Sequence, residues 1–311
     1  MKICSLLPSA TETLYALGLK DEVVGVTDIC DYPPEVKSKH VVCRSLFDPA
    51  KLTSAEVEAR MRDILKDGGS PFVLDVDWLR RVQPDLIIAQ DLCYRCSHDA
   101  SEVAKVCDVS GISAEVLTLH PTTIAGIFDS MTRIARLTGS EEQASRVIKR
   151  LRDRIRAVSE KVADATYRPR VFSVEGVDPL VVGGNWLPEM RALAGGRDDL
   201  FAPGSPAKRI GWDVVRAAAP EILVIALCSS PMVRSMKESE WLRRHEGWSD
   251  LPAVRDGRVY VVEHVYFSRP GPRIVTGIEI LAELLNPALF SGTIPEGAAR
   301  ALPTDAIQVR P

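Results

Sequence analysis

The stretch that decides the fold is Asp77-Trp-Leu-Arg-Arg-Val-Gln-Pro84-Asp85-Leu-Ile-Ile-Ala89, because it occurs twice. The second copy reads Asp213-Val-Val-Arg-Ala-Ala-Ala-Pro220-Glu221-Ile-Leu-Val-Ile-Ala226. In each copy an acid stands seven positions before a proline, and a second acid and an apolar run follow that proline. The pattern predicts a helix that begins near a carboxylate, ends at the proline and leads into a buried parallel strand. Two copies far apart in the chain indicate two similar lobes.

The length and composition fit two ordinary globular domains. The chain has 311 residues, of which 46% are hydrophobic and 26% charged, with a net charge of −3. These values give no reason to expect a nucleic acid or an anionic membrane as partner. No apolar run approaches the ~18 residues of a membrane span. We therefore expect a monomer with two cores.

The first residues and the cysteines bear on the compartment. Residues 1–9 lead straight into a strand-like segment, with no room for a secretory leader. The seven cysteines form no regular framework, which favours reduced thiols. The sequence as written predicts a cytoplasmic protein, or a periplasmic one if a leader was removed or the start is misplaced.

Strand and helix patterns alternate along the whole chain, which predicts an α/β fold with parallel sheets covered on both faces. One pattern is helical without a break from residue 140 to about 164, with a capping-box start and a single apolar stripe. We expect an N-terminal α/β lobe over 1–138 with an insertion at about 48–76, a linking long helix over 139–166, a C-terminal α/β lobe over 167–286, and a Pro/Gly-rich tail over 287–311. Strands are predicted over 2–7, 23–26, 86–89, 114–118, 171–174, 222–226 and 259–262, and further helices over 9–18, from 53, and over 97–108, 187–194, 212–219, 236–245 and 274–285.

Signatures of catalysis are missing from the sequence. It contains no phosphate loop, dinucleotide fingerprint, nucleophile elbow or H-E-x-x-H zinc motif. We therefore expect a protein that is not an enzyme and that binds no nucleotide.

The Cys93-x-x-Cys96 pair is the sharpest local motif. It precedes a predicted helix, whose N-terminus would favour a thiolate for metal ligation or redox work. Ordinary reduced thiols, contact with a ligand or metal, and dithiol redox chemistry all stay open. His120 and His264 each follow a predicted strand, the ligand-facing edge of an α/β lobe, and each is a candidate metal ligand or a turn cap.

Aromatic residues gather in predicted loops and at helix starts. Flat, amphipathic rings at such positions suit a cleft for a large and partly apolar ligand, although hinge and loop packing would explain them as well. The candidates are Tyr32, Trp186, Trp212, Tyr266 and Phe267.

The first acids of the two copies, Asp77 and Asp213, have two interpretations. Each is placed to cap its helix, and the matched pair also suits docking on a basic partner.

These segments together resemble the ABC-transporter substrate-binding proteins in which one long helix joins two α/β lobes, the class III periplasmic-binding-protein type. The resemblance is closest to the cobalamin-binding periplasmic receptors, in particular a leaderless branch. It runs in order from residue 2 to about 286. It rests on Ser5-Leu-Leu-Pro-Ser-Ala-Thr-Glu12, Asp31-Tyr-Pro-Pro34, both copies of the repeat and Phe267-Ser-Arg-Pro-Gly-Pro-Arg-Ile274.

The resemblance implies a ligand and roles for particular residues. The ligand would be cobalamin or another corrinoid in a cleft between the lobes, with Tyr32, Tyr266 and Phe267 on its faces. Asp77 and Asp213 would dock on an ABC permease, although Glu is typical there. With such a ligand, Trp186 and Trp212 would add further ring contacts, Arg44 and Arg269 would meet its polar groups, and a thiol of Cys93 or Cys96 would reach the cobalt.

Two other functions stay open. One is a receptor for a metal or a metal chelate, such as a siderophore or haem, with Cys93, Cys96, His120 or His264 as metal ligands. The other is a cytosolic redox protein that uses Cys93 and Cys96.

Overall fold

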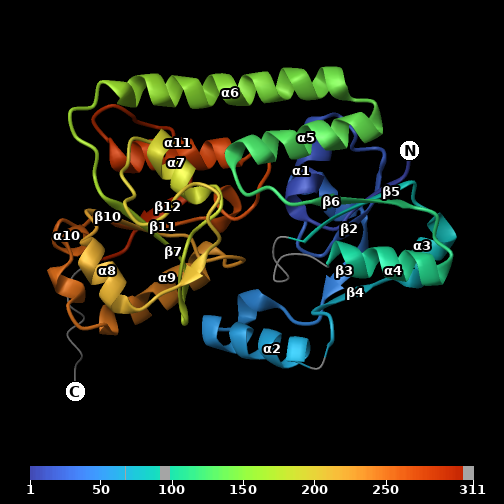
Figure 1. Cartoon of the computed structure of the whole chain (residues 1–311), viewed down its shortest axis with the longest axis horizontal. Coiled ribbons are helices and arrows are strands. Elements are labelled where there is room, and N and C mark those ends of the chain that lie inside the picture. Colours follow the sequence, from blue (N-terminus) through green and yellow to red (C-terminus); the bar gives the residue numbers. More distant parts are fainter. Residues whose placement is uncertain (67, 92–98, 304–311) are drawn as a thin grey trace. The chain divides into compact units, whose positions relative to one another are not determined.

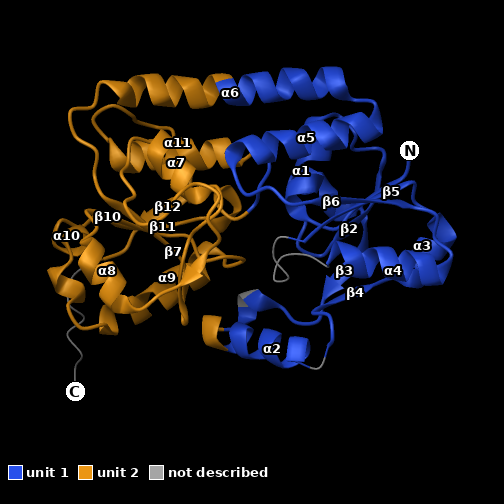
Figure 2. Cartoon of the chain, in the orientation of Figure 1, with its two compact units in different colours: residues 1–52, 56–152, 269–272 blue, residues 53–55, 153–268, 273–311 orange. Residues whose placement is uncertain are grey.

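The computed structural model describes residues 1–66, 68–91 and 99–303, which divide into two compact units (Figure 1; Figure 2). Unit 1 comprises Met1–Leu52, Glu56–Arg152 and Arg269–Pro272. Unit 2 comprises Thr53–Ala55, Asp153–Ser268 and Arg273–Pro311. Each unit is a sheet with helices on both faces, which confirms the predicted fold class.

Unit 1 contains a six-stranded sheet in the order β4-β3-β2-β1-β5-β6. All neighbouring strands are parallel except β3 and β4. Its strands are β1 (Ile3–Ser5), β2 (Val23–Thr27), β3 (His40–Ser45), β4 (Phe72–Leu74), β5 (Leu86–Gln90) and β6 (Glu115–Leu119). Its helices are α1 (Pro8–Ala16), α2 (Ser54–Lys66, whose first two residues belong to unit 2), α3 (Val76–Val82), α4 (Ala100–Ser110) and α5 (Ile124–Thr138), with short 3₁₀ turns η1 (Pro34–Ser38) and η2 (Pro49–Lys51).

The core of unit 1 follows from the alternation of its strands. Leu6 and Ile87 point to one face of the sheet, where they pack against Leu79 of α3 and Val103 of α4. Figure 1 shows α1 and α5 on the opposite face. Because both faces are covered, the central strands carry continuous apolar runs.

Unit 2 contains a second six-stranded sheet, in the order β12-β11-β10-β7-β8-β9. Its parallel centre is β11-β10-β7, and the other pairings are antiparallel. Its strands are β7 (Val171–Val177), β8 (Leu180–Val182), β9 (Lys208–Arg209), β10 (Ile222–Ile225), β11 (Val259–Val262) and β12 (Ala299–Ala301). Its helices are α7 (Leu187–Leu193), α8 (Trp212–Ala218), α9 (Met232–Ser239), α10 (Pro252–Arg255) and α11 (Ile274–Leu285), with 3₁₀ turns η3 (Glu240–Arg244), η4 (Trp248–Asp250) and η5 (His264–Tyr266).

The long helix is α6 (Glu141–Ala163), close to its predicted bounds. The boundary between the units falls inside it, between Arg152 and Asp153. Within unit 2, Arg154 holds it to α11, since its Nε donates to Glu279 Oε1 at 2.9 Å. In the described part of the chain, no helix has both the length and the apolar character that crossing a bilayer requires.

The two copies of the sequence repeat have the same structure. In both units the acid after the proline accepts a hydrogen bond from a backbone N–H just before the neighbouring strand. In unit 2 the backbone N–H of Arg170 donates to Glu221 Oε2 at 2.9 Å, and Arg170 Nε donates to the carbonyl of Ala219 at 3.0 Å. Arg170 directly precedes β7, and Glu221 directly precedes β10, the strand that pairs with it. We call this arrangement the strand–helix lock.

Unit 1 contains the same lock, built from Lys2 and Asp85. The backbone N–H of Lys2 donates to Asp85 Oδ2 at 2.6 Å, and its Nζ donates to the carbonyl of Val82 at 2.8 Å. In both copies the helix ends on a left-handed residue before the proline, Gln83 or Ala219. The proline stops the helix, and the acid after it fixes the start of the neighbouring strand.

A partly buried ion cluster holds the loop after β2 in unit 1. The Arg269 side chain donates to both carboxylate oxygens of Asp31, at 2.5 and 3.0 Å, and to Glu12 Oε1 at 3.3 Å. Arg269 is 8% exposed and Glu12 3%. A forked guanidinium satisfies such a pair of carboxylates with directed hydrogen bonds.

Several elements were not predicted. β3, β4, β8, β9, β12 and α5 are absent from the predicted series, and the supposed insertion at 48–76 contributes β4 as an antiparallel edge strand. The helix predicted over 236–245 is instead α9 followed by η3. Of the strands missed, β4, β8, β9 and β12 are only two or three residues long, too short for a clear alternating pattern.

We predict that Glu221→Ala lowers the free energy of unfolding by about 1–2 kcal/mol, because it removes the acceptor of a partly buried backbone N–H. Partial burial raises the pKa of Glu221, but hydrogen bonds from Arg170 and Tyr167 and the charges of Arg170 and Arg197 lower it overall. A carboxylate with a lowered pKa stabilises the fold above its unfolded pKa and loses that effect as the pH falls. Urea titrations should therefore show the difference shrinking below about pH 4. Asp85→Ala in the exposed lock is the matched variant and should cost less; an equal loss at pH 7 and pH 3 would contradict the explanation.

We predict that Arg269→Met lowers the free energy of unfolding by about 3–5 kcal/mol, because the buried Glu12 carboxylate loses its guanidinium. The double variant Glu12→Gln/Arg269→Met removes both charges and should recover part of that loss in the same urea titrations. A double variant that is less stable by the sum of the two single losses would show that the ion pair itself contributes nothing.

Candidate functional site

The carboxyl ends of the parallel strands form the edge at which α/β units bind ligands. In unit 1, Tyr32 follows the end of β2 and its side chain is 45% exposed. Its neighbour Asp31 is held by Arg269, so the ring is presented by a fixed loop. The structure thus places Arg269 behind this loop, with its donors turned to Asp31 and Glu12. Arg44 lies on β3 and is exposed.

In unit 2 three of the predicted aromatic residues, Trp186, Tyr266 and Phe267, meet at the turn after β11. The indole N–H of Trp186 donates to the backbone carbonyl of Phe267 at 2.7 Å. Both rings are buried, with exposed fractions of 5% and 2%. Tyr266, the last residue of η5, is partly exposed, and the Arg273 guanidinium lies over its ring, 5.6 Å from the centroid. The buried pair therefore supports the turn that presents Tyr266.

Trp212 lies in a different aromatic cluster of unit 2. Its ring stacks on His245 with centroids 4.5 Å apart, and it lies 6.0 Å from Trp248. Its indole N–H donates to the carbonyl of Glu246 at 2.9 Å. Burial lowers the pKa of His245, so this imidazole is neutral at physiological pH. Trp212 thus fixes the start of α8 and is not part of the Trp186–Phe267 pair.

The first acids of the repeat do not cap their helices, which corrects that interpretation. The N-cap of α3 is Asp75, whose side chain accepts from the backbone N–H of Trp78 at 3.0 Å. The N-cap of α8 is Gly211. Asp77 and Asp213 each occupy the second helical position and are exposed, Asp77 by 82% of its side chain. They are therefore equivalent surface carboxylates at two helix N-termini.

The described part of the structure shows no metal site at the predicted metal ligands. His120 belongs to unit 1, where its Nδ1 lies 2.6 Å from Asp91 Oδ1, and His264 belongs to unit 2. Cys93 and Cys96 lie outside the residues that the structure describes. Within residues 1–66, 68–91 and 99–303, no three His, Cys, Asp or Glu side chains are placed to hold one metal ion.

One group that sequence reasoning missed lies at the carboxyl edge of unit 2. Glu175 is the first residue of β7 beyond its pairing with β10, and Cys228 donates its backbone N–H to the Glu175 carbonyl at 3.0 Å. Both side chains are partly exposed. Nearby, Arg191 is 2% exposed and bound to Asp198 and Ser173. The predicted strand stopped at Val174, and the β-branched Val177 three positions further was the signal that could have extended it.

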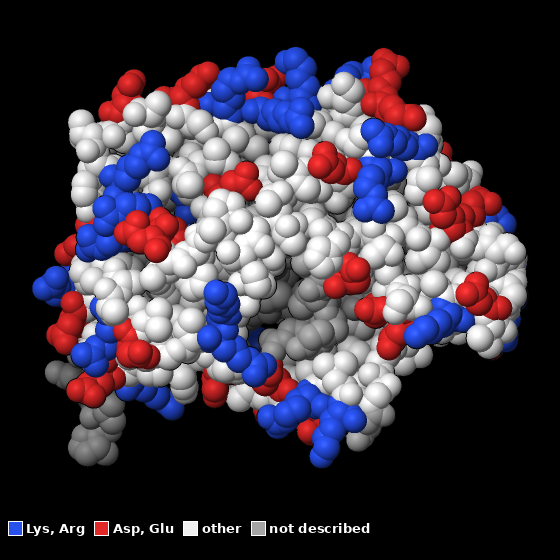
Figure 3. Space-filling model, viewed as in Figure 1, with Lys and Arg blue, Asp and Glu red and all other residues white. Residues whose placement is uncertain are grey.

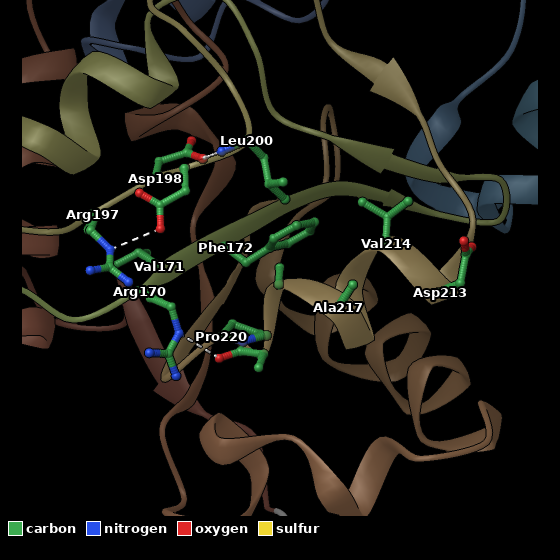
Figure 4. A pocket seen from close by; sticks show the side chains of 13 residues that line it. Arg170, Val171, Phe172, Arg197, Asp198, Leu200, Asp213, Val214, Ala217 and Pro220 are labelled. Atoms are coloured by element: carbon green, nitrogen blue, oxygen red, sulfur yellow. Dashed lines mark hydrogen bonds and ion pairs between the residues drawn. The ribbon is translucent and has the colours of Figure 1, made fainter.

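A cavity of about 610 Å³ lies at the opposite, amino edge of unit 2. Figure 4 shows Arg170 and Arg197 at one end of it and Asp213 at the other end, on α8. Arg197 Nε lies 2.9 Å from Asp199 Oδ2, and Arg170 belongs to the strand–helix lock. Because these cations already have carboxylate partners, we assign the cavity no ligand.

Charges are mixed over the surface. In Figure 3, Lys and Arg gather over α6 and elsewhere alternate with Asp and Glu. Apart from the face of α6, this view shows no continuous basic surface for a nucleic acid.

Known proteins match the chain over nearly all its length. An ABC transporter substrate-binding lipoprotein of Bacillus subtilis is 27% identical over 296 residues, which cover 93% of this chain and 81% of the relative. A vitamin B12-binding protein of Photorhabdus laumondii is 24% identical, with 92% and 88% covered.

Solved structures share the fold. A periplasmic haem-binding protein of Pseudomonas aeruginosa superposes with a TM-score of 0.70 at 19% identity, covering 93% of this chain and 94% of the other. The vitamin B12-binding protein of Vibrio cholerae gives 0.65 at 20% identity, with 93% and 98% covered. Residues 3–266 match the periplasmic binding protein family. The chain therefore belongs to that family, as an ABC-transporter substrate-binding protein.

Proposed function

We propose that the chain is a ligand carrier whose ligand is cobalamin or a related corrinoid. One observation supports this most directly: each unit presents a tyrosine ring at the carboxyl edge of its parallel strands. Tyr32 follows β2 and Tyr266 follows β11. Aromatic rings on fixed loops, exposed at Tyr32 and partly exposed at Tyr266, suit the flat, partly apolar faces of a macrocycle.

The relatives support the same ligand. Several curated relatives that match about nine-tenths of this chain are vitamin B12-binding or cobalamin-binding proteins. The haem-binding structures share the fold at lower identity, so haem is the competing ligand in the test below.

The burial of the other candidates suggests supporting roles. Trp186 and Phe267 are buried and hydrogen-bonded to each other, so they would hold the Tyr266 turn. Arg269 would hold the Tyr32 loop through Asp31. Exposed Arg44 retains its proposed role at a polar group of the ligand.

We expect purified protein to bind cyanocobalamin saturably with one ligand per chain, measured by equilibrium dialysis and by the absorbance of the bound corrinoid. Tyr32→Ala and Tyr266→Ala should each weaken binding by about 10- to 100-fold, because each removes an aromatic side chain that the ligand would bury. Tyr167→Ala is the matched control, since Tyr167 is an exposed tyrosine that precedes β7 at the amino edge.

Saturable binding of haemin, with no binding of cyanocobalamin, would show that the ligand is a metal chelate and not a corrinoid. Tyrosine variants that bind as tightly as the wild-type protein would show that these rings are not at the ligand.

We also propose that Asp77 and Asp213 dock on basic side chains of an ABC permease. Charge reversal in Asp77→Lys/Asp213→Lys should leave cyanocobalamin affinity within about twofold, because both acids lie on the helix surface. The same variant should reduce corrinoid uptake at least about tenfold in cells that depend on this protein, because like charges would then meet at the interface. Asp63→Lys/Asp108→Lys, at two other exposed acids, is the matched control. Full uptake by the docking variant would contradict the proposal.

A further inference from the structure

The Glu175 carboxyl lies where a ligand of unit 2 would meet it. The ladder between β7 and β10 ends with Val174 paired to Ile225. Glu175 is the next residue, at the carboxyl edge that also carries Tyr266 after β11. As a residue it is partly exposed, at the edge where an α/β unit binds its ligand.

The surroundings of Glu175 leave it uncharged. Burial and, to a smaller extent, the neighbouring Cys228 raise its pKa while Arg191 lowers it, and together they give a pKa of about 8. Most of the carboxyl is therefore protonated at neutral pH and offers an O–H donor.

Arg191 is the cation that acts on Glu175, and its guanidinium is already bound to other side chains. Its Nε donates to Asp198 Oδ2 at 3.1 Å, and its terminal nitrogens bind Asp198 and Ser173. Among the residues that the structure describes, none forms a hydrogen bond or ion pair with the Glu175 carboxyl. Its donor is therefore available to a ligand.

Gly183, after β8, packs closely against the aliphatic part of the Glu175 side chain. A Cβ at Gly183 would lie 3.2 Å from Glu175 Cγ, 3.1 Å from Ser173 Oγ and only 2.3 Å from a Leu187 methyl carbon. A larger residue there would push against the side chain of Glu175. The groups that face Glu175 are thus Cys228 after β10, Ser173 on β7 and Arg191 on α7.

We propose that protonated Glu175 donates its O–H to a carbonyl oxygen of the ligand, so that unit 2 favours a ligand edge bearing neutral amides over one bearing carboxylates. The inference rests on the proposed function and adds a residue that determines specificity. A corrinoid ring has amide side chains around its edge, and their carbonyl oxygens accept hydrogen bonds. A carboxylate ligand would meet a carboxyl and a thiol, with the nearby guanidinium already bound to Asp198.

The test measures cyanocobalamin affinity from about pH 6 to about pH 9.5 in the full chain and in three variants. The axial cyanide of this corrinoid does not titrate in that range. Because the ligand would bind the protonated form, wild-type affinity should be constant up to about pH 7 and fall about tenfold per pH unit above 8. Glu175→Gln keeps a donor at every pH, so its affinity should lie within about threefold of wild type at pH 7 and stay flat.

The other two variants separate Glu175 from its neighbour. Glu175→Ala should lose about five- to tenfold at pH 7 and show no pH dependence. Cys228→Ser removes the adjacent thiol, which contributes to the raised pKa of Glu175, so it should keep the fall in affinity but move it to lower pH. A fall that persists in Glu175→Gln, or its absence in wild type, would overturn the inference while leaving the proposed function standing.

A measurement on the protein without ligand distinguishes failure of this inference from failure of the proposed function. In protein labelled with ¹³C-glutamate, the carboxyl resonance that Glu175→Gln removes should titrate near pH 8 and shift upward when cyanocobalamin is added. Titration near the ordinary value of about 4.3 would overturn the inference alone. Failure of the wild-type protein to bind cyanocobalamin at any pH would overturn the proposed function and this inference with it.

Discussion

The strand–helix lock is the contact on which the rest of each unit depends. A proline ends the helix, and the next acid binds the backbone N–H at the start of the neighbouring strand, through Glu221 and Arg170 in one unit and Asp85 and Lys2 in the other. This contact sets where two central strands begin relative to each other. Since side chains alternate between faces, a slip of one residue would turn every apolar side chain of those strands to the wrong face.

The two edges of each sheet therefore differ in chemistry. The amino edge is closed by charged groups that bind one another, as Arg170 and Glu221 do. The carboxyl edge carries rings on supported turns, and in unit 2 a carboxyl that burial keeps neutral. The supports are buried and polar, as with Arg269 behind the Tyr32 loop. Such a network orders a loop because breaking it would leave a buried charge without its partner, in a protein interior that solvates charge poorly.

Most of the fold could be predicted from the sequence, because the repeated segment and the long amphipathic helix carry strong patterns. The edge strands could not: β9 has only two residues, and its place depends on pairing with β8 and not on its own composition. Asp77 was a reasonable cap from the sequence, yet Asp75 lies two positions earlier and its side chain reaches the Trp78 N–H. The candidate rings could be found one by one, but whether a ring is exposed like Tyr32 or buried like Phe267 depends on contacts with distant segments.

The placement of charge also separates the two things that a substrate-binding protein must do. Asp77 and Asp213 are exposed at helix N-termini, where solvent screens their charge. Glu175 lies at a strand end where burial favours the neutral form. In the roles proposed above, carboxyl groups of similar intrinsic acidity would serve opposite purposes: the surface acids would present charge to a partner protein, and the edge acid would present a proton to a ligand. On these proposals docking and ligand selection would depend on separate groups, solvent-screened surface acids for the first and an edge carboxyl for the second.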